Sequence, residues 1–156
     1  MEPIAERLDL PDGYGTANST MAWEAVRERL EQAPRYWLVT TLRNGRAHVV
    51  PVDGVWLDDT WYYGGSPETL HQRNLERDPR VVVHLEDTVA AVILEGSMRR
   101  RTPTVELAKR LAAASKAKYG YGPTPEMYAA GVWGLRPIRA RAWTGFPGDA
   151  TRFRFA

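Results

Sequence analysis

The chain has 156 residues, of which 44% are hydrophobic and 26% are charged, and its formal net charge is +2. This composition is ordinary for one globular domain with a hydrophobic core, and the small net charge argues against a nucleic-acid partner. The absence of cysteine excludes disulfides and cysteine-ligated metals, and no apolar run is long enough to span a membrane, so we expect a soluble cytoplasmic protein without membrane or nucleic-acid partners.

The first 18 residues are predicted to form an arm in front of a single domain that covers residues 19–156. The arm combines prolines and glycines with little hydrophobic periodicity, so we expect it to be poorly ordered or loosely docked. The domain is predicted to open with an amphipathic helix that Ser19 or Thr20 caps and Pro34 ends. The apolar residues of this helix recur at helical spacing: Trp23, Val26, Leu30 and Ala33.

The pattern then changes to strand-like runs. Residues 36–57 hold two such runs joined by Asn44-Gly45, which is the strongest short-range signal for a hairpin. Asp53 interrupts the second run beside a glycine and indicates a bulge or a bend. A second turn, at Asp58-Asp59, is predicted to lead into a third strand at residues 60–63.

Residues 64–80 connect this third strand to the next and hold two glycines and one short polar helix. Such an arrangement can hold a phosphate at the helix start, or it can be a plain connector. Ser66 is predicted to be the N-cap of the helix, with Pro67 at its first position. A serine nucleophile is disfavoured, because the Gly-x-Ser-x-Gly pattern is missing.

The remaining chain is predicted to complete a small antiparallel barrel. Residues 89–94 are apolar on both strand faces, so we expect this strand inside a barrel wall that a helix or a partner subunit covers. The total is six or seven mostly antiparallel strands with two main helices, which predicts a mainly β (α+β) barrel with flanking helices. The other predicted elements are a strand at 81–85, a helix at 102–119 that Gly120 stops, a further turn within 122–131, and strands at 138–144 and 151–155.

No catalytic residue can be assigned from the sequence. The histidines His48, His71 and His84 lack the spacing of a metal site, so we expect none. Paired carboxylates, a Walker motif and a dinucleotide-binding motif are also missing, so an enzyme of this sequence would depend on a bound cofactor. The cationic run at 98–101 is either a solvated strand end or a clamp for an anionic ligand tail.

Two stretches carry a family resemblance. Residues 35–97 contain a hairpin, a strand that ends in tyrosine, a short helix with Arg73-Asn74-Leu75, and Asp78-Pro79-Arg80 before a valine-rich strand. This order resembles the pyridoxamine 5'-phosphate oxidase-like split barrels, which bind FMN or the deazaflavin coenzyme F-420. Residues 133–155 are similar, more weakly, to the C-terminal strands of that family.

The resemblance implies a split β-barrel homodimer with a cofactor site at the subunit interface. It implies FMN as cofactor, with coenzyme F-420 as the alternative, and hydride transfer to or from a small conjugated substrate. The ring would lie against one strand, formed by His48, Val49, Val50, Pro51 and Val52. The phosphate would lie at the start of the short helix, near Ser66, Thr69, His71 and Arg73. The partner subunit's Trp143 and Arg152 would cover the ring.

Three positions depart from the family's pattern. Leu70 and His71 stand where many relatives have the arginine and lysine that hold the phosphate, so a protonated His71 would have to recover part of that charge. Asp53 stands where the pyridoxamine oxidases have lysine, which argues against pyridoxamine phosphate as substrate. A second hypothesis therefore stays open: a non-catalytic split barrel that binds flavin or, through His71 or His84, haem.

Overall fold

The computed structural model describes residues 2–156, and in this range the chain forms ten strands and four helices. In chain order these are β1 (Ile4–Arg7), α1 (Trp23–Gln32), β2 (Tyr36–Thr41), β3 (Ala47–Val52), β4 (Val55–Leu57), β5 (Thr60–Tyr63), α2 (Leu70–Arg77), β6 (Arg80–His84), β7 (Val92–Arg101), α3 (Val105–Tyr119), α4 (Pro125–Ala129), β8 (Val132–Leu135), β9 (Arg139–Ala142) and β10 (Thr151–Arg154).

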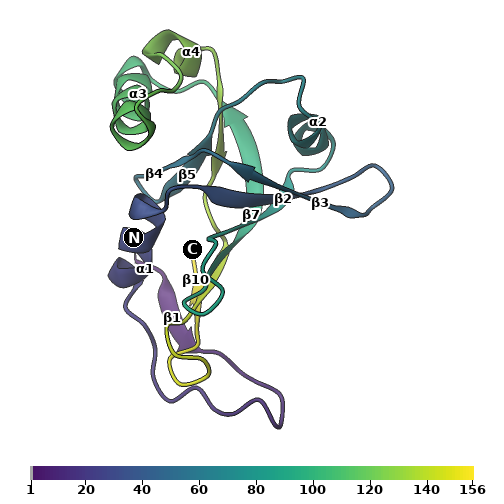
Figure 1. Cartoon of the computed structure of the whole chain (residues 1–156), viewed down its shortest axis with the longest axis vertical. Coiled ribbons are helices and arrows are strands. Elements are labelled where there is room, and N and C mark those ends of the chain that lie inside the picture. The colour runs from purple at the N-terminus through teal and green to yellow at the C-terminus, as the bar shows by residue number, and fades with distance from the viewer. Residues whose placement is uncertain (1) are drawn as a thin grey trace.

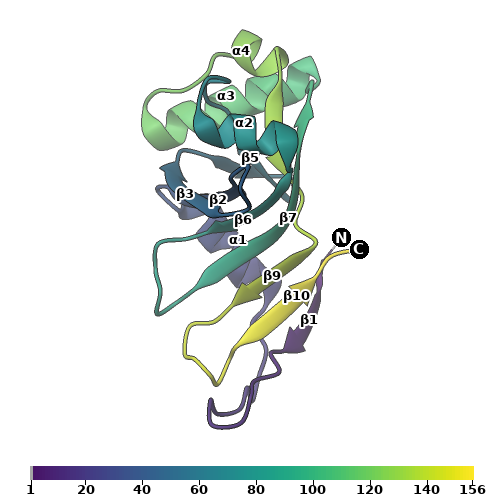
Figure 2. The same ribbon diagram turned by 90° about the vertical axis from the view of Figure 1, so that its right-hand side faces the viewer.

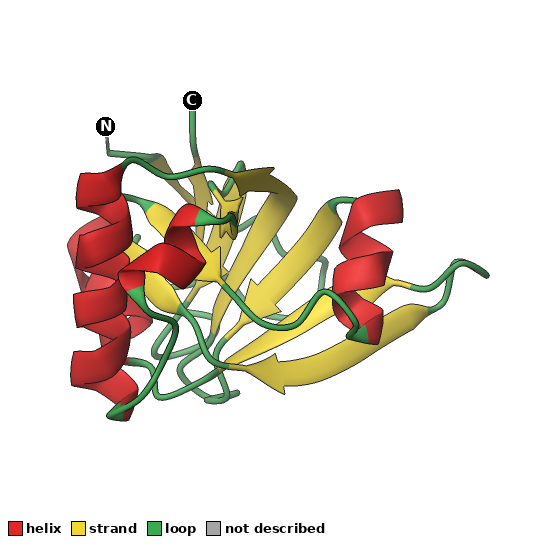
Figure 3. Ribbon diagram, turned by 90° about the horizontal axis from the view of Figure 1, so that it is seen from above, coloured by secondary structure: helices red, strands yellow, loops and turns green. Residues whose placement is uncertain are grey.

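The strands form the antiparallel split β-barrel that the sequence predicts. Neighbouring strands run in the order β1-β10-β9-β7-β6-β2-β3, and β8, β5 and β4 continue from the far half of β7 (Figure 2). The long strand β7 joins the two halves, because its residues 92–95 pair with β9 and its residues 98–101 pair with β8. Helix α2 lies apart from the other three helices, on the opposite side of the strands (Figures 1 and 3).

The core fills the inside of this barrel. Residues of β2 alternate between buried and partly exposed, as expected for a strand with one face toward the core. Leu38 of β2 lies opposite Val83 of β6, which lies opposite Leu94 of β7, and all three are fully buried. A smaller apolar cluster packs α3 and α4 onto the other strands: Val55, Tyr62, Ala108, Leu111, Tyr128 and Val132.

The main turns and the second helix are confirmed. Gly45 has a positive φ of 82° in the turn between β2 and β3, and Asp58-Asp59 joins β4 to β5 with positive φ at both residues. Helix α3 begins after Thr104, whose side chain accepts from Leu107 N, and it ends at Gly120 in the left-handed conformation. The further predicted turn is α4.

The structure has ten strands rather than six or seven for three local reasons. The second half of the first hairpin is divided at Asp53-Gly54 into β3 and β4, which confirms the predicted bend. Residues 132–135 form β8, a short buried strand without alternating polarity. Residues 4–7 of the arm form β1, which pairs along its length with β10, so the prediction of a loosely docked arm is wrong for this segment.

Other local predictions are also wrong. The N-cap of α1 is Ala22, without a side-chain cap, and the N-cap of α2 is Thr69 rather than Ser66. The apolar run at 89–94 is not buried on both faces, because β7 begins only at Val92 and Val89 is 75% exposed. No helix of residues 2–156 combines the length and the apolar character needed to cross a membrane.

The bend between β3 and β4 depends on a glycine. A Cβ atom added to Gly54 would lie within 2.8 Å of three ring atoms of Trp61, and Trp61 is fully buried. The indole therefore occupies the space of a side chain, and only glycine permits this approach of the backbone.

We expect Gly54→Ala to lower the free energy of unfolding by about 1–3 kcal/mol, because the buried indole has no free space to move into. Urea unfolding followed by tryptophan fluorescence measures this change. Gly145→Ala is the matched control, since a Cβ there has no neighbour within 4 Å. Equal stability of the two variants would show that Trp61 adapts without cost.

Candidate functional site

A cleft of about 540 Å³ lies where the ends of β3 and β5 meet the turn before α2. This volume suits a ligand the size of a small cofactor. The lining residues come from four parts of the chain: Arg35; Pro51–Val55; Tyr62–Ser66 with Thr69 and His71; and Ser115, Tyr121–Pro123 and Tyr128 around the end of α3.

Tyrosines form much of the wall of this cleft. Tyr62, Tyr63 and Tyr128 are buried, so their positions are set by packing. Burial raises the pKa of Tyr63 and of Tyr128, so both hydroxyls stay protonated at neutral pH and are able to donate hydrogen bonds. The wall can therefore contact a flat ring with apolar faces and polar edges.

The first turn of α2 brings unpaired backbone donors to one end of the cleft. Arg73 N donates to Thr69 O at 3.2 Å, and the amides of residues 70–72 have no backbone acceptor in the described chain. The preceding turn is closed by Ser66 O, which accepts from Thr69 N at 3.1 Å and from Thr69 Oγ1 at 2.8 Å. Free N–H groups at a helix start favour an anion, and this is the end at which the sequence predicts a phosphate.

His71 lies in the cleft wall beside these donors. Its Nε2 is hydrogen-bonded to the hydroxyl of Tyr63, and its ring stacks on His48 with centroids 6.3 Å apart. Burial lowers the pKa of His71, and the electrostatic effect of the neighbouring His48 lowers it further. His71 is therefore neutral at neutral pH and does not supply the positive charge that the family resemblance leads us to expect at this position.

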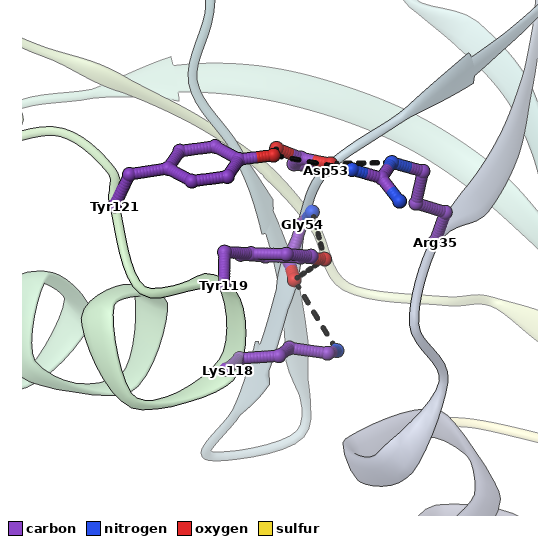
Figure 4. Close-up of polar contacts among 6 residues, drawn as sticks. All are labelled: Arg35, Asp53, Gly54, Lys118, Tyr119 and Tyr121. Carbon is purple, nitrogen blue, oxygen red and sulfur yellow. Dashed lines mark hydrogen bonds and ion pairs between the residues drawn. The ribbon is translucent and has the colours of Figure 1, made fainter.

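The opposite end of the cleft carries a carboxylate. Asp53 Oδ1 lies 3.0 Å from Arg35 Nε, and Asp53 Oδ2 accepts from the hydroxyl of Tyr121 at 2.9 Å (Figure 4). A guanidinium N–H of Arg35 also donates to the Tyr121 hydroxyl at 3.1 Å. These side chains come from the segments before β2, after β3 and after α3, so their contacts tie three segments together beside the cleft.

Gly54 holds the end of α3 in place next to this carboxylate. Its N–H donates to the Tyr119 hydroxyl at 3.0 Å, and its carbonyl lies 2.9 Å from the same hydroxyl and 3.4 Å from Lys118 Nζ (Figure 4). Lys118 Nζ also donates to the Tyr36 hydroxyl at 2.6 Å, and burial lowers the pKa of Lys118 to about 8. These contacts position Tyr121 at the cleft.

Five of the predicted cofactor-binding residues line the cleft: Pro51, Val52, Ser66, Thr69 and His71. The structure thus brings together the predicted strand end and the predicted helix start. Their roles in binding stay predictions.

Other predicted residues lie outside the cleft lining. His48 reaches the site through its stacking on His71. Val49 is half exposed on the other face of β3, and Val50 packs against the core, so consecutive residues of this strand point to opposite sides. Arg73 lines a separate hollow on α2.

The residues predicted to act across the subunit interface lie far from the cleft within one chain. Trp143 contacts Phe146, and Arg152 donates to Glu6 Oε2 at 2.9 Å. The cationic run at 99–101 lies at the end of β7 and is not part of the cleft lining. Among residues 2–156, no group of three or more His, Cys, Asp or Glu side chains is arranged to hold a metal ion.

Sequence reasoning missed several residues of the cleft, among them Arg35, Tyr63 and Tyr121. Arg35 and Tyr121 are 86 positions apart and meet only through the bend at Gly54, so no local pattern connects them. Tyr63 ends a predicted strand, and a short polar helix begins seven residues later. This position before the helix is the one local signal that Tyr63 belongs to the cleft.

Comparisons with known proteins agree with this geometry. Residues 22–143 match the family model described as pyridoxamine 5'-phosphate oxidase, whereas no curated protein sequence matches the chain. Among solved structures, the conserved hypothetical protein Rv2991 from Mycobacterium tuberculosis is 20% identical with a TM-score of 0.67, and the match covers 81% of this chain and 87% of that one.

Two further structures are similar. A heme binding protein from Mycobacterium smegmatis is 25% identical with a TM-score of 0.57, and the match covers 80% of this chain but only 55% of that protein. An F420 reductase is 14% identical with a TM-score of 0.52, and the match covers 94% of this chain and 97% of that one. At 20% and 14% identity, the similarities to Rv2991 and to the F420 reductase show the fold alone.

The lowered pKa of His71 should make stability depend on pH. The unfolded chain takes up a proton at His71 near the ordinary value of 6.5, whereas the folded protein takes it up only at lower pH. The free energy of unfolding therefore decreases as the pH falls below 6.5. We expect His71→Asn to reduce the loss of stability between pH 7.5 and pH 5.5, as measured by urea unfolding.

His84→Asn serves as the control, because it leaves His71 and the cleft unchanged and should retain the wild-type decrease. Titration of the imidazole signals by NMR tests the cause directly. A His71 pKa at or above 6.5 in the folded protein would contradict the assignment of a neutral imidazole.

Proposed function

The chain belongs to the pyridoxamine 5'-phosphate oxidase family, and from this premise we propose that it binds a flavin-type cofactor in its cleft and works as an oxidoreductase. The cofactor we propose is FMN, with the deazaflavin coenzyme F-420 as the alternative. The reaction we propose is hydride transfer to or from a small conjugated substrate.

One observation carries this proposal. A single cleft of about 540 Å³ joins the end of β3 to Thr69 and His71 at the start of α2, where the amides of residues 70–72 have no backbone acceptor in the described chain. In a flavin-type cofactor a flat ring and a phosphate are joined by a flexible chain, so its site needs a flat-walled space next to an anion-binding end. The cleft supplies both within one connected volume.

The residues of the cleft fit a flavin-type cofactor, but they offer little positive charge to its phosphate. Buried tyrosines supply walls for a ring, and the amides of residues 70–72 supply donors for a phosphate. The α2 end of the cleft contains no arginine or lysine, and His71 is neutral. A neutral hydrogen bond contributes about 0.5–1.5 kcal/mol and one to a charged partner about 1.5–3 kcal/mol, so we expect weaker phosphate binding than with a lysine at this position.

When bound, the cofactor would supply the hydride chemistry, because no side chain of the cleft is a redox group. The chain itself would orient the ring between the tyrosines and keep water from its buried face. Tyr63 and His71 would hold one proton between the phenol oxygen and Nε2, beside the anion-binding end. This pair can adjust its protonation when an anion arrives, because a negative charge raises the pKa of a neighbouring imidazole.

The carboxylate of Asp53 indicates whether the substrate carries a phosphate. It faces the cleft at the end away from α2 and is paired with one arginine, Arg35. A phosphorylated substrate at this end would find an arginine whose charge Asp53 already pairs, so we propose an unphosphorylated conjugated substrate rather than pyridoxamine phosphate.

We propose that the site is completed in a homodimer. Two rows of side chains lie on the outer face of the sheet, as the strand register shows. They are mainly apolar and partly exposed, which is typical of a surface that a partner covers. The first row consists of Pro51, Trp37, His84 and Ile93, and the second of Val49, Val39 and Val82, followed by the charged Glu95 on β7. In such a dimer the partner subunit's Trp143 and the partner subunit's Arg152 would be available to the cleft.

A non-catalytic haem protein is the second candidate. The similarity to the mycobacterial heme binding protein favours it, as does the presence of a histidine, His71, in the cleft wall. The absorbance spectrum of freshly purified protein separates the two candidates. Absorbance bands of a bound flavin or of a bound deazaflavin support the oxidoreductase. A Soret band supports haem binding.

We expect FMN to bind the purified apoprotein and His71→Lys to tighten this binding roughly fivefold to tenfold, because a charged donor replaces a neutral one. Fluorescence titration measures both constants. Glu76→Gln is the matched control, since it also raises the net charge by one but lies at the other end of α2. Riboflavin, which lacks the phosphate, should bind both variants alike. The proposal is wrong if neither FMN nor coenzyme F-420 binds at micromolar concentration.

The dimer proposal predicts that Val49→Asp shifts the protein toward a monomer, because it places a charge in the apolar outer face of the sheet. Size-exclusion chromatography with light scattering measures the mass. Val105→Asp is the matched control, since Val105 is an exposed valine on α3, away from this face. A wild-type monomer, or a dimer that both variants retain, would contradict the assigned interface.

A further inference from the structure

A second hollow, of about 520 Å³, lies on another face of α2 and has no part in the proposed function so far. We call it the arginine hollow. Residues 42–44 of the turn between β2 and β3 form one side, and four residues of α2 form the other: Leu70, Arg73, Asn74 and Arg77.

The helix residues of the arginine hollow share one face of α2. They follow one another at helical spacing from position 70 to position 77, which corresponds to about 10 Å along the helix axis. Thr69 and His71, on either side of Leu70 in the chain, line the cleft. The first turn of α2 thus separates the two spaces, and a ligand that passes over it reaches both.

No salt bridge among the described residues pairs the arginines of the arginine hollow. The hollow is lined by three arginines, and no acidic side chain of residues 2–156 contributes to its lining. Within the described chain, Arg43 and Arg73 form no ion pair. This differs from arginines elsewhere on the surface, such as Arg110, which pairs with Asp58 at 2.7 Å.

Arg77 is held in position by neutral groups alone. Its guanidinium donates to the carbonyl of Thr41 and, at 3.2 Å, to Asn74 Oδ1. Asn74 is itself buried and donates to Thr40 Oγ1 at 3.1 Å. The hollow therefore has one oriented guanidinium that forms no salt bridge among the described residues, although its charge also acts on the nearby carboxylate of Asp78.

We propose that the arginine hollow is a second anion site, which binds a group with two or more negative charges, of pyrophosphate or oligocarboxylate chemistry. Two arginines lie one helical turn apart on α2, about 6 Å along its axis, and a third stands on the facing turn, so together they match several anionic centres better than one. Where the proposed function holds, the hollow takes the anionic extension of a flavin-type cofactor beyond its first phosphate.

The chain contains a matched control for this site. Arg99–Arg101 is also a run of exposed arginines, but it lies at the end of β7 and lines neither the cleft nor the arginine hollow. Arg100 donates to the carbonyl of Ala130 at 3.5 Å. An effect of bulk positive charge would be equal in both places, whereas a site would not.

The first experiment uses inorganic pyrophosphate and does not depend on any cofactor. Calorimetry at low salt compares the wild type, the double variant Arg43→Gln/Arg73→Gln and the control Arg99→Gln/Arg100→Gln. We expect the first double variant to weaken pyrophosphate binding at least tenfold and the control to leave it unchanged. No binding to the wild type, or equal losses in both variants, overturns the proposal. Circular dichroism confirms that the exposed substitutions leave the fold intact.

The second experiment tests the link to the cleft and separates the two sources of the anion. Titration compares FMN with FAD, which carries a pyrophosphate, and with coenzyme F-420, which carries an oligoglutamate. We expect Arg43→Gln/Arg73→Gln to weaken only the cofactor whose extension enters the hollow, and to leave FMN unchanged. The link is overturned if each of the three cofactors binds this variant as tightly as it binds the wild type. If no flavin binds at all, the proposed function fails, while the pyrophosphate result still decides the anion site.

Discussion

The contact between the Gly54 backbone and the buried indole of Trp61 determines how the rest of this molecule is arranged. Because the ring occupies the place of a side chain, the strand must end there, and β3 turns into β4. The turn leaves the amide and carbonyl of Gly54 without strand partners, and the hydroxyl of Tyr119 pairs with both. The end of α3 is thereby fixed against the barrel, which places Tyr121 beside Asp53 at one end of the cleft.

The charges around the cleft are distributed unevenly. Its α2 end offers backbone amides and a neutral imidazole, and its other end holds the carboxylate of Asp53 with Arg35. The concentrated positive charge lies one helix face away, in the arginine hollow. A ligand of this protein would therefore be oriented in the cleft by hydrogen bonds and shape, while long-range electrostatic attraction would come from outside it.

Helix α2 connects these features. One face of the helix carries Leu75, which is buried in the core, and one turn earlier His71, which lines the cleft, whereas Arg73 lies on another face and lines the arginine hollow. The helical period alone predicts that His71 and Arg73 lie on different faces, and the structure agrees. What each face meets depends on the strands beneath, because Asn74 is bonded to β2 and Arg77 reaches the end of the same strand.

Local sequence patterns establish the order of the elements, because turn residues and hydrophobic periods act over a few positions. Asn44-Gly45, Asp58-Asp59 and Gly120 were correctly predicted to end their elements, and the family resemblance led to the split barrel and to the cleft between β3 and α2. The lowered pKa of His71, the pairing of Asp53 with Arg35 and Tyr121, and the docking of β1 follow instead from the folded arrangement. Burial and contacts between residues 18 to 150 positions apart set these properties, and no local pattern encodes them.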